Sequence, residues 1–332
     1  MYFQKQFDQI STMNVPADFP KSATLHHRSD ALILDELLRR AHFRSDVYFR
    51  NKLCDSWSLD TSGTGRVSFH IVREGSCWLH VPGRAEPQRL EAGDVLVVPR
   101  DVTHALSSGR AAPPAGKVLM PNKVSLQDAS EGVALLCGYL DIDRASRRML
   151  LSGLPETLIV RPHTSSLARQ TSDLLQLMFN EAAQEDQGGQ AVLDRLADAL
   201  LLYIIRLCVS EQSAQLGLFA ALADPQLGTL VRALCSEPER DWSLASMATS
   251  VNMSRSAFVA RFQELLQQPP IAFLTEWRMR SARSYLQKSR QSTLAIAESC
   301  GYSSEAAFSK AFKREEGVGP GEYRRHFQSS KN

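Results

Sequence analysis

The chain has 332 residues, about twice the usual length of a domain, which predicts two domains that can each bury a core. Hydrophobic residues make up 43% and charged residues 22%, which argues against a disordered, collagen-like or membrane-embedded chain. The formal net charge is +2, but residues 237–332 hold 14 Lys and Arg against 10 Asp and Glu, so they carry +4 and the remainder −2. Six scattered cysteines and an N-terminus without a secretion signal predict a cytoplasmic protein with buried thiols.

The first two thirds of the chain change from helical to strand-like and back to helical patterns. Helical spacing predicts a helix over 31–42, and two amphipathic helices over 166–184 and 191–208. Between them, short apolar runs separated by Gly and Pro predict an antiparallel barrel or sandwich with strands near 68–73, 77–81, 95–99, 117–120 and 133–139. The predicted fold class is therefore α+β. We expect a ligand-binding and dimerisation domain at 1–212, a linker at 213–224 and an all-helical domain at 225–332.

Two segments of the last domain repeat one pattern. Ala248 precedes Asn252 by four residues, and Ala297 precedes Gly301 by four. A small residue lets two helices cross closely, and the residue four later must tolerate a left-handed backbone, which is typical of a helix-turn-helix. Each segment continues with an N-cap serine and two phenylalanines: Ser254, Phe258 and Phe262, and then Ser304, Phe308 and Phe312. A continuous helix over 271–286 would hold the two units about 34 Å apart, the spacing of successive major grooves.

Around these units, residues 225–327 closely resemble the AraC/XylS family of transcriptional regulators. The landmarks are Trp242, residues 274–283, Gly301-Tyr-Ser-Ser304, residues 308–313 and Gly317-Val-Gly-Pro-Gly-Glu-Tyr-Arg324. The resemblance implies binding to promoter DNA and an encounter with RNA polymerase. It also implies that the exposed start of each recognition helix reads bases, which nominates Ser256, Val259, Ala260, Glu305, Ala306 and Lys310.

The chemistry of these positions separates base contacts from phosphate contacts. Glu305 could accept a hydrogen bond from cytosine N4, and Lys310 could donate one to guanine. Ala260 stands where the family often has arginine, so we expect Arg261 to contact phosphate instead. Further phosphate candidates, each equally able to be a solvated surface charge, are Arg255, Arg278, Arg280, Arg283, Lys313, Arg314, Arg324 and Arg325.

The N-terminal half resembles a cupin. Gly93-Asp-Val-Leu-Val-Val-Pro99 to His104 is similar to the second half of the cupin signature, and residues 69–75 lie where the first half belongs. Catalytic cupins hold a metal with three histidines and a glutamate, whereas only His70 and His104 are found here. The resemblance therefore implies a metal-free ligand pocket, no cofactor and no enzyme. A metallo-cupin enzyme with an attached DNA-binding module is an alternative that metal analysis would detect.

Upstream, Arg40-Ala-His-Phe-Arg44 and Asp60-Thr-Ser62-Gly-Thr-Gly65 resemble the R-x-x-x-R and D-x-S-x-x-G motifs with which PilZ domains bind cyclic di-GMP. Arginine forks can pair with phosphate or guanine, and glycines permit close backbone approach. R-x-x-x-R alone is not specific, because Arg144 and Arg148 form a second copy. The motifs could also be one side of an amphipathic helix followed by a simple turn.

Together these motifs resemble the cyclic-di-GMP-responsive AraC-type activators of exopolysaccharide genes. Our leading hypothesis is a transcription activator that binds cyclic di-GMP through Arg40, Arg44, Asp60, Ser62 and Gly65, and that dimerises when the nucleotide binds. The alternative keeps the DNA reader but places a sugar or small aromatic ligand inside the barrel, near His70, Trp78 and His104. The two helices after the barrel could form the dimer or could simply pack on the barrel.

Overall fold

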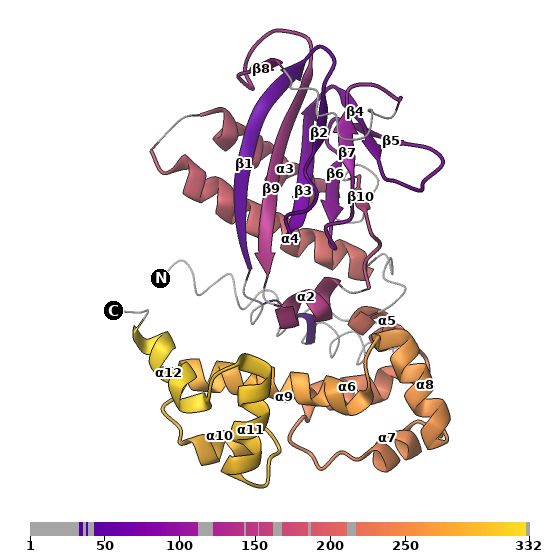
Figure 1. The fold of residues 1–332 in the computed structure, drawn as a ribbon, viewed down its shortest axis with the longest axis vertical. Coiled ribbons are helices and arrows are strands. Elements are labelled where there is room, and N and C mark those ends of the chain that lie inside the picture. Colours follow the sequence, from indigo (N-terminus) through magenta and orange to yellow (C-terminus); the bar gives the residue numbers. More distant parts are fainter. Residues whose placement is uncertain are drawn as a thin grey trace, which may run out of the picture.

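The computed structural model describes most of the chain, namely residues 33–35, 38, 43–111, 122–142, 144–151, 153–161, 168–184, 187–210 and 217–329. A β-rich part stands above a helical part (Figure 1). The α+β class, with antiparallel sheets before a helical domain, is as predicted. Residues 33–35 and 38 are helical, whereas Arg40, the strand expected at 117–120 and residues 213–216 of the expected linker lie outside the described residues.

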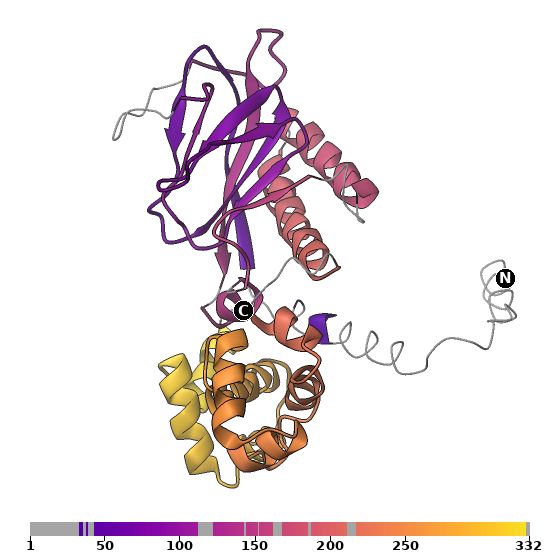
Figure 2. The same ribbon diagram turned by 90° about the vertical axis from the view of Figure 1, so that its right-hand side faces the viewer.

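The β-rich part consists of two antiparallel sheets packed face to face (Figure 2). The six-stranded sheet has the order β10-β6-β3-β9-β1-β8, formed by β10 (Leu158–Val160), β6 (Val95–Val98), β3 (Val67–Glu74), β9 (Val133–Ile142), β1 (Phe43–Cys54) and β8 (Asn122–Val124). The four-stranded sheet has the order β2-β7-β4-β5, formed by β2 (Ser58–Asp60), β7 (Ala105–Ser107), β4 (Ser76–His80) and β5 (Gln88–Glu91). Strands β3, β4, β6 and β9 confirm four of the predicted segments. A shared core of apolar side chains, including Val72, Leu79, Leu106 and Leu135, fills the space between the sheets.

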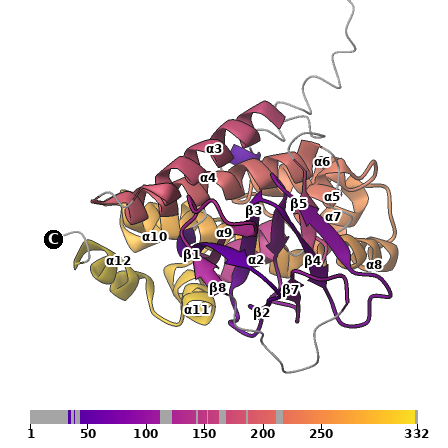
Figure 3. The ribbon, with the colours of Figure 1, turned by 90° about the horizontal axis from the view of Figure 1, so that it is seen from above.

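Helices α3 (Ala168–Ala183) and α4 (Gly189–Ser210) cover the outer face of the six-stranded sheet (Figure 3). Asp198 accepts a hydrogen bond from the backbone N–H of Ser45 at 2.8 Å, and Asp194 accepts one from Val47 at 3.0 Å. These carboxylates satisfy backbone donors of β1, which, among the described strands, only β8 borders on that side, at residues 52–54. On these two helices, Leu193 and Leu200 are buried in the core shared with the sheet, whereas Leu177 is 50% exposed.

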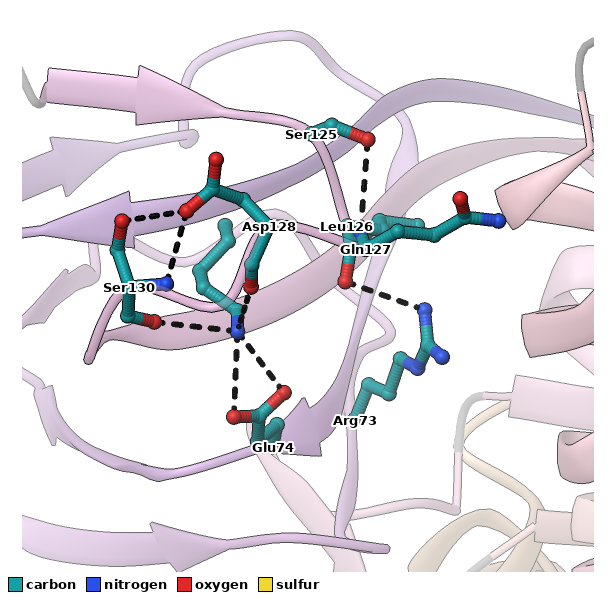
Figure 4. Close-up of polar contacts among 8 residues, drawn as sticks. Arg73, Glu74, Ser125, Leu126, Gln127, Asp128 and Ser130 are labelled. Atoms are coloured by element: carbon teal, nitrogen blue, oxygen red, sulfur yellow. Dashed lines mark hydrogen bonds and ion pairs between the residues drawn. The ribbon is translucent and has the colours of Figure 1, made fainter.

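The buried Lys52 joins the 125–130 loop to the end of this sheet formed by the last residues of β1 and β3, and its partners Glu74, Asp128 and Ser130 are labelled in Figure 4. The ammonium of Lys52, which is 3% exposed, donates to the carboxylate of Glu74 and to the carbonyl oxygens of Asp128 (2.7 Å) and Ser130 (3.2 Å). All three donors of the ammonium are thereby used, which is the condition for burying such a charge. Lys52 is therefore structural.

The helical part comprises α5 (Gly217–Ala223), α6 (Gly228–Ser236), α7 (Leu244–Ser250), α8 (Arg255–Leu266), α9 (Pro270–Lys288), α10 (Thr293–Ser299), α11 (Glu305–Glu316) and α12 (Pro320–Ser329). Helix α5 falls within the segment expected to be a linker, and it packs against α8 through the apolar core. Short α2 (Arg144–Leu151) lies between the β-rich and helical parts (Figure 1).

The two helix-turn-helix units do not belong to the same core. Buried residues of α2, α4, α5, α7 and α8 form one continuous cluster with the outer face of the six-stranded sheet. The second unit packs in a separate cluster around Met279, Leu286, Ile296, Phe308 and Phe312. The first unit is thus joined to the β-rich part by apolar packing, and the second is attached through α9. Among the helices described, none is long and apolar enough to span a bilayer.

Candidate DNA-reading surface and effector site

Both turns have the backbone geometry that the sequence requires. Asn252 and Gly301 are left-handed, with φ of 54° and 74°. The backbone N–H that follows each turn residue returns to the small residue of the preceding helix: Met253 donates to Ala248 at 3.0 Å, and Tyr302 donates to Ala297 at 2.9 Å. The repeated pattern therefore builds two equivalent helix-turn-helix units, α7–α8 and α10–α11.

The recognition helices α8 and α11 begin and pack in the same way. Ser254 and Ser304 cap them by accepting from the backbone N–H three residues later, at 3.3 and 3.2 Å. Phe258, Phe262, Phe308 and Phe312 are fully buried. One side of each recognition helix therefore packs against the rest of its unit, and the other side faces solvent.

The open sides carry most of the predicted DNA contacts. In α8, Arg255, Ser256 and Ala260 are exposed and Val259 is half-buried, and together with Leu244 and Gln263 they line a hollow. Sequence reasoning missed Gln263, although its spacing of seven from Ser256 places it on the same face. In α11, the exposed candidates are Glu305, Ala306, Lys310, Lys313 and Arg314.

Arg261, expected to contact phosphate, is paired with two carboxylates of the chain itself. Its guanidinium pairs with Asp224, which follows α5, and with Glu264, both at 2.8 Å, and these contacts raise its pKa. These two ion pairs connect the end of α5 to the first recognition helix, and a phosphate contact by Arg261, whose side chain is 36% exposed, would compete with them. Of the other phosphate candidates, Arg280 is buried, Arg278 bonds the carbonyls of Pro238 and Arg240, and Arg283 pairs with Glu316.

Of the residues predicted to bind the effector, Arg44, Asp60, Ser62 and Gly65 are described. They lie at the start of β1 and between the end of β2 and the start of β3, at the end of the β-rich part that faces the helical part (Figure 1). Arg44 stands opposite Asp141 in the β1–β9 register, and it is exposed on a strand rather than on a helix. On the other side of β9, Arg66 pairs with the same Asp141 at 3.2 Å. Arg44 and Arg66 therefore flank one carboxylate, next to Gly65.

The Asp60–Gly65 segment is a tight loop whose own polar groups are already bonded. Asp60 accepts from the backbone N–H (3.0 Å) and hydroxyl (2.6 Å) of Ser62. The backbone N–H groups of Gly63 and Gly65 both donate to the carboxylate of Asp101. The loop thus presents two converging N–H donors to an anion, and here that anion is an aspartate.

An aromatic pair adjoins this loop. Tyr48 and Tyr139 stack with ring centroids 4.5 Å apart and planes at 18°, and Tyr48 is 43% exposed. The Arg66 guanidinium lies 5.7 Å from the centre of the Tyr139 ring. The sequence motifs do not include Tyr48, Tyr139 or Arg66, because strand pairing alone brings them together.

Deeper between the sheets, Thr61 joins the two cupin histidines. Its hydroxyl bonds Nε2 of His70 at 3.2 Å and Nε2 of His104 at 2.9 Å, and the two Nε2 atoms lie 3.3 Å apart. Burial, together with the nearby charge of His104, lowers the pKa of His70 to about 3. Within the described ranges, no three His, Cys, Asp or Glu side chains gather as metal ligands, and two imidazoles do not match the cupin metal set.

Comparisons with known proteins agree with this architecture. Residues 33–210 match the family described as Cupin, and residues 247–326 match the helix-turn-helix domain. The chain is 30% identical to an uncharacterized HTH-type transcriptional regulator of Haemophilus influenzae, covering 88% of this chain and 98% of the relative. It is also 30% identical to a Streptomyces lividans protein described as an AraC-like transcription regulator (89% and 97% covered), and to the HTH-type transcriptional regulator MtrA of Neisseria gonorrhoeae (88% and 98%). The chain therefore belongs to the AraC family of DNA-binding transcriptional regulators, with an N-terminal cupin domain and a C-terminal helix-turn-helix domain.

Proposed function

We propose that this regulator activates transcription under the control of cyclic di-GMP bound at the end of the cupin domain. One observation carries the proposal: the β1–β9–β3 register places Arg44 and Arg66 on either side of Asp141, beside Gly65 and the Tyr48–Tyr139 stack. Residues that lie far apart in the sequence thus combine arginine forks, ring faces and converging N–H donors.

Each of these groups suits one part of a cyclic dinucleotide. Arginine forks pair with phosphate or with guanine O6 and N7, and purine rings stack on tyrosine. The Gly63 and Gly65 N–H groups hold a carboxylate at present, so phosphate would be accepted by the same donors once Asp101 moved aside. Asp60 would accept hydrogen bonds from guanine N–H groups in place of those that it now accepts from Ser62.

The remaining parts of the proposal concern the assembly. The nucleotide would favour a dimer whose four helix-turn-helix units bind a promoter and recruit RNA polymerase, with exopolysaccharide genes as the expected targets. Nucleotide can favour this state only by binding it more tightly than the free state. Exposed Leu177 on α3 is the apolar residue most available for such a dimer contact.

Isothermal titration calorimetry of cyclic di-GMP into the full-length protein tests the proposal, with GTP as a specificity control. Arg40→Ala, Arg44→Ala and Arg66→Ala are expected to abolish saturable binding. Arg110→Ala is the matched control, since Arg110 is an exposed arginine that pairs with Glu86 and lies over the ring of Trp78 instead of Tyr139. Absence of saturable heat and of binding by a second method would remove the nucleotide from the proposal.

A second candidate is a small sugar or aromatic ligand inside the cupin domain. Nδ1 of His70 is buried and has no hydrogen-bond partner among the described residues, so a small polar group there would satisfy it. Thermal unfolding of wild-type protein and of His70→Phe, with a panel of monosaccharides and benzoates, tests this candidate. A ligand that stabilises only the wild type would support it, and no stabilisation by any of them would reject it.

A further inference from the structure

Helix α2 stands at the junction of the sensing and reading parts. It begins two residues after β9, the strand that carries Tyr139 and Asp141, and its buried residues Met149, Leu150 and Leu151 join the core shared with α5. Two adjacent arginines of this short helix reach in different directions.

The first arginine, Arg147, contacts the Asp60–Gly65 segment, which we call the effector loop. Nη1 of Arg147 donates to the carbonyl oxygen of Gly65 at 2.9 Å. Gly65 is left-handed, with φ of 70°, and its N–H is bonded to Asp101. The peptide groups on both sides of Gly65 are therefore hydrogen-bonded, one to Asp101 and one to Arg147 of α2.

The second arginine, Arg148, contacts helix α9 of the helical part. Nε and Nη2 of Arg148 each lie 2.9 Å from Oε2 of Glu276, on helix α9. Glu276 is 5% exposed, and burial raises its pKa in spite of Arg148, Arg280 and Arg283 nearby. A buried carboxylate is strongly unfavourable without a partner, so this contact ties α2 to α9. Nη2 of Arg280 lies 3.4 Å from the hydroxyl of Ser146, which adds a second contact between the same helices.

Helix α9 connects the two helix-turn-helix units, and the second unit packs on it through Met279, Ala282 and Leu286. We infer that α2 couples the effector loop to the DNA-reading units, with Arg147 on Gly65 and Arg148 on Glu276 as its two attachment points. A ligand that displaces the Gly65 loop changes how α2 holds α9, and hence how the two reading helices are presented.

The coupling must act in both directions, because a ligand that changes DNA affinity is itself bound differently when DNA is present. DNA bound to the reading units therefore changes the stability of the Gly65 loop. The inference rests on the proposed function for the identity of the effector, but this reciprocal effect can be measured without any effector.

Hydrogen-exchange mass spectrometry of the full-length chain, with and without a DNA fragment selected from a random pool, provides the test. In the wild type, saturating DNA is expected to change exchange severalfold in peptides covering residues 61–66. Glu276→Gln, which avoids a buried unpaired charge, and Arg148→Gln are expected to abolish that change. Arg147→Ala, which leaves the Glu276 pair intact, is expected to do the same.

Arg110→Gln serves as the control, because it removes an exposed arginine remote from α2 and should retain the change. Fluorescence anisotropy verifies that every variant is saturated with DNA. The inference is overturned if wild-type exchange in the loop does not respond to bound DNA, or if all three variants respond as the wild type does. Failure of cyclic di-GMP to bind in calorimetry removes the proposed effector and leaves the exchange result to decide the coupling.

Discussion

His70 illustrates a residue whose burial determines its proton chemistry. Burial and the charge of His104 lower its folded-state pKa to about 3, from 6.5. Below pH 6.5 the unfolded chain binds a proton that the folded chain does not. The free energy of unfolding should therefore fall by about 1.4 kcal/mol per pH unit between pH 6.5 and about 3 from this group.

Urea unfolding at pH 7.5, 6 and 5 measures this loss. His70→Gln should make the curve flatter over that range, whereas His326→Gln, at an exposed position of α12, should leave the slope unchanged. Equal slopes in wild type and His70→Gln would show that the buried imidazole does not cause the dependence.

Lys310 and Lys313 allow base reading to be separated from phosphate contact on one helix. Both are exposed on α11 and are spaced so that they share a face. Lys310→Ala should relax the preference at one base position by about 1–3 kcal/mol. Lys313→Ala should weaken binding to all sequences and reduce the log–log salt slope by about 0.9.

Anisotropy titrations with a selected DNA site and a scrambled duplex, at several salt concentrations, distinguish these effects. The two substitutions remove the same charge, so any difference between them comes from position. If both variants lose the same amount of affinity for specific DNA as for scrambled DNA, Lys310 does not read a base.

At the scale of elements, the turn at Gly301 is both left-handed and tightly packed. A Cβ added there would lie 2.7 Å from the carbonyl oxygen of Glu239 and 2.8 Å from its Cα, in addition to the backbone strain at φ of 74°. Gly317 has nearly the same backbone, with φ of 78°, but no atom within 4 Å of an added Cβ.

Gly317→Ala should therefore lower the free energy of unfolding by about 1–2 kcal/mol, the cost of a left-handed non-glycine residue. Gly301→Ala should lower it further and should weaken DNA binding, because α10 and α11 can no longer meet at the same angle. Chemical denaturation measures both variants, and equal destabilisation would show that the 238–241 loop moves aside freely.

Strand β1 shows why elements of the β-rich part are harder to predict than the helices. Its sequence, FRSDVYFRNKLC, mixes charged and apolar residues on both faces, and it contains a register shift between Val47 and Phe49. The strand is stabilised by pairing with β9 and by the aspartates of α4, and these partners are 80 or more residues away in sequence. No local pattern within 43–54 indicates those partners.

At the scale of the whole molecule, the two reading units should differ in their dependence on the cupin domain. Phe262 and Phe312 occupy equivalent buried positions in the two units, but Phe262 belongs to the core shared with the sheet and Phe312 to the separate one. Replacing either with alanine should be destabilising by about 3–5 kcal/mol.

Hydrogen exchange should show which helices are destabilised by each substitution. Phe312→Ala is expected to speed exchange in α10–α12 only. Phe262→Ala should speed exchange in its own unit, α7–α8, and in α5 and α2 as well. Identical patterns from the two variants would mean that the reading domain unfolds as one unit, without regard to its two cores.

The sequence by itself determined the doubled helix-turn-helix and the cupin halves. The signals involved are local: a left-handed turn residue, a small residue four positions before it, an N-cap serine and phenylalanines at helical spacing all act within one or two turns of helix. These positions were predicted correctly in both units, and so was the exposure of the candidate DNA contacts on α11.

Only the tertiary structure decided which charged residues are free. Arg261 pairs with Asp224, and Arg280 is buried at the junction with α2, whereas the sequence offers both as candidates for phosphate contact without indicating these surroundings. Likewise, Arg66 and Tyr139 join Arg44 only through the register of three strands. The physical reason is range: a helix satisfies its backbone within four residues, while sheets and buried ion pairs depend on partners that sequence spacing does not specify.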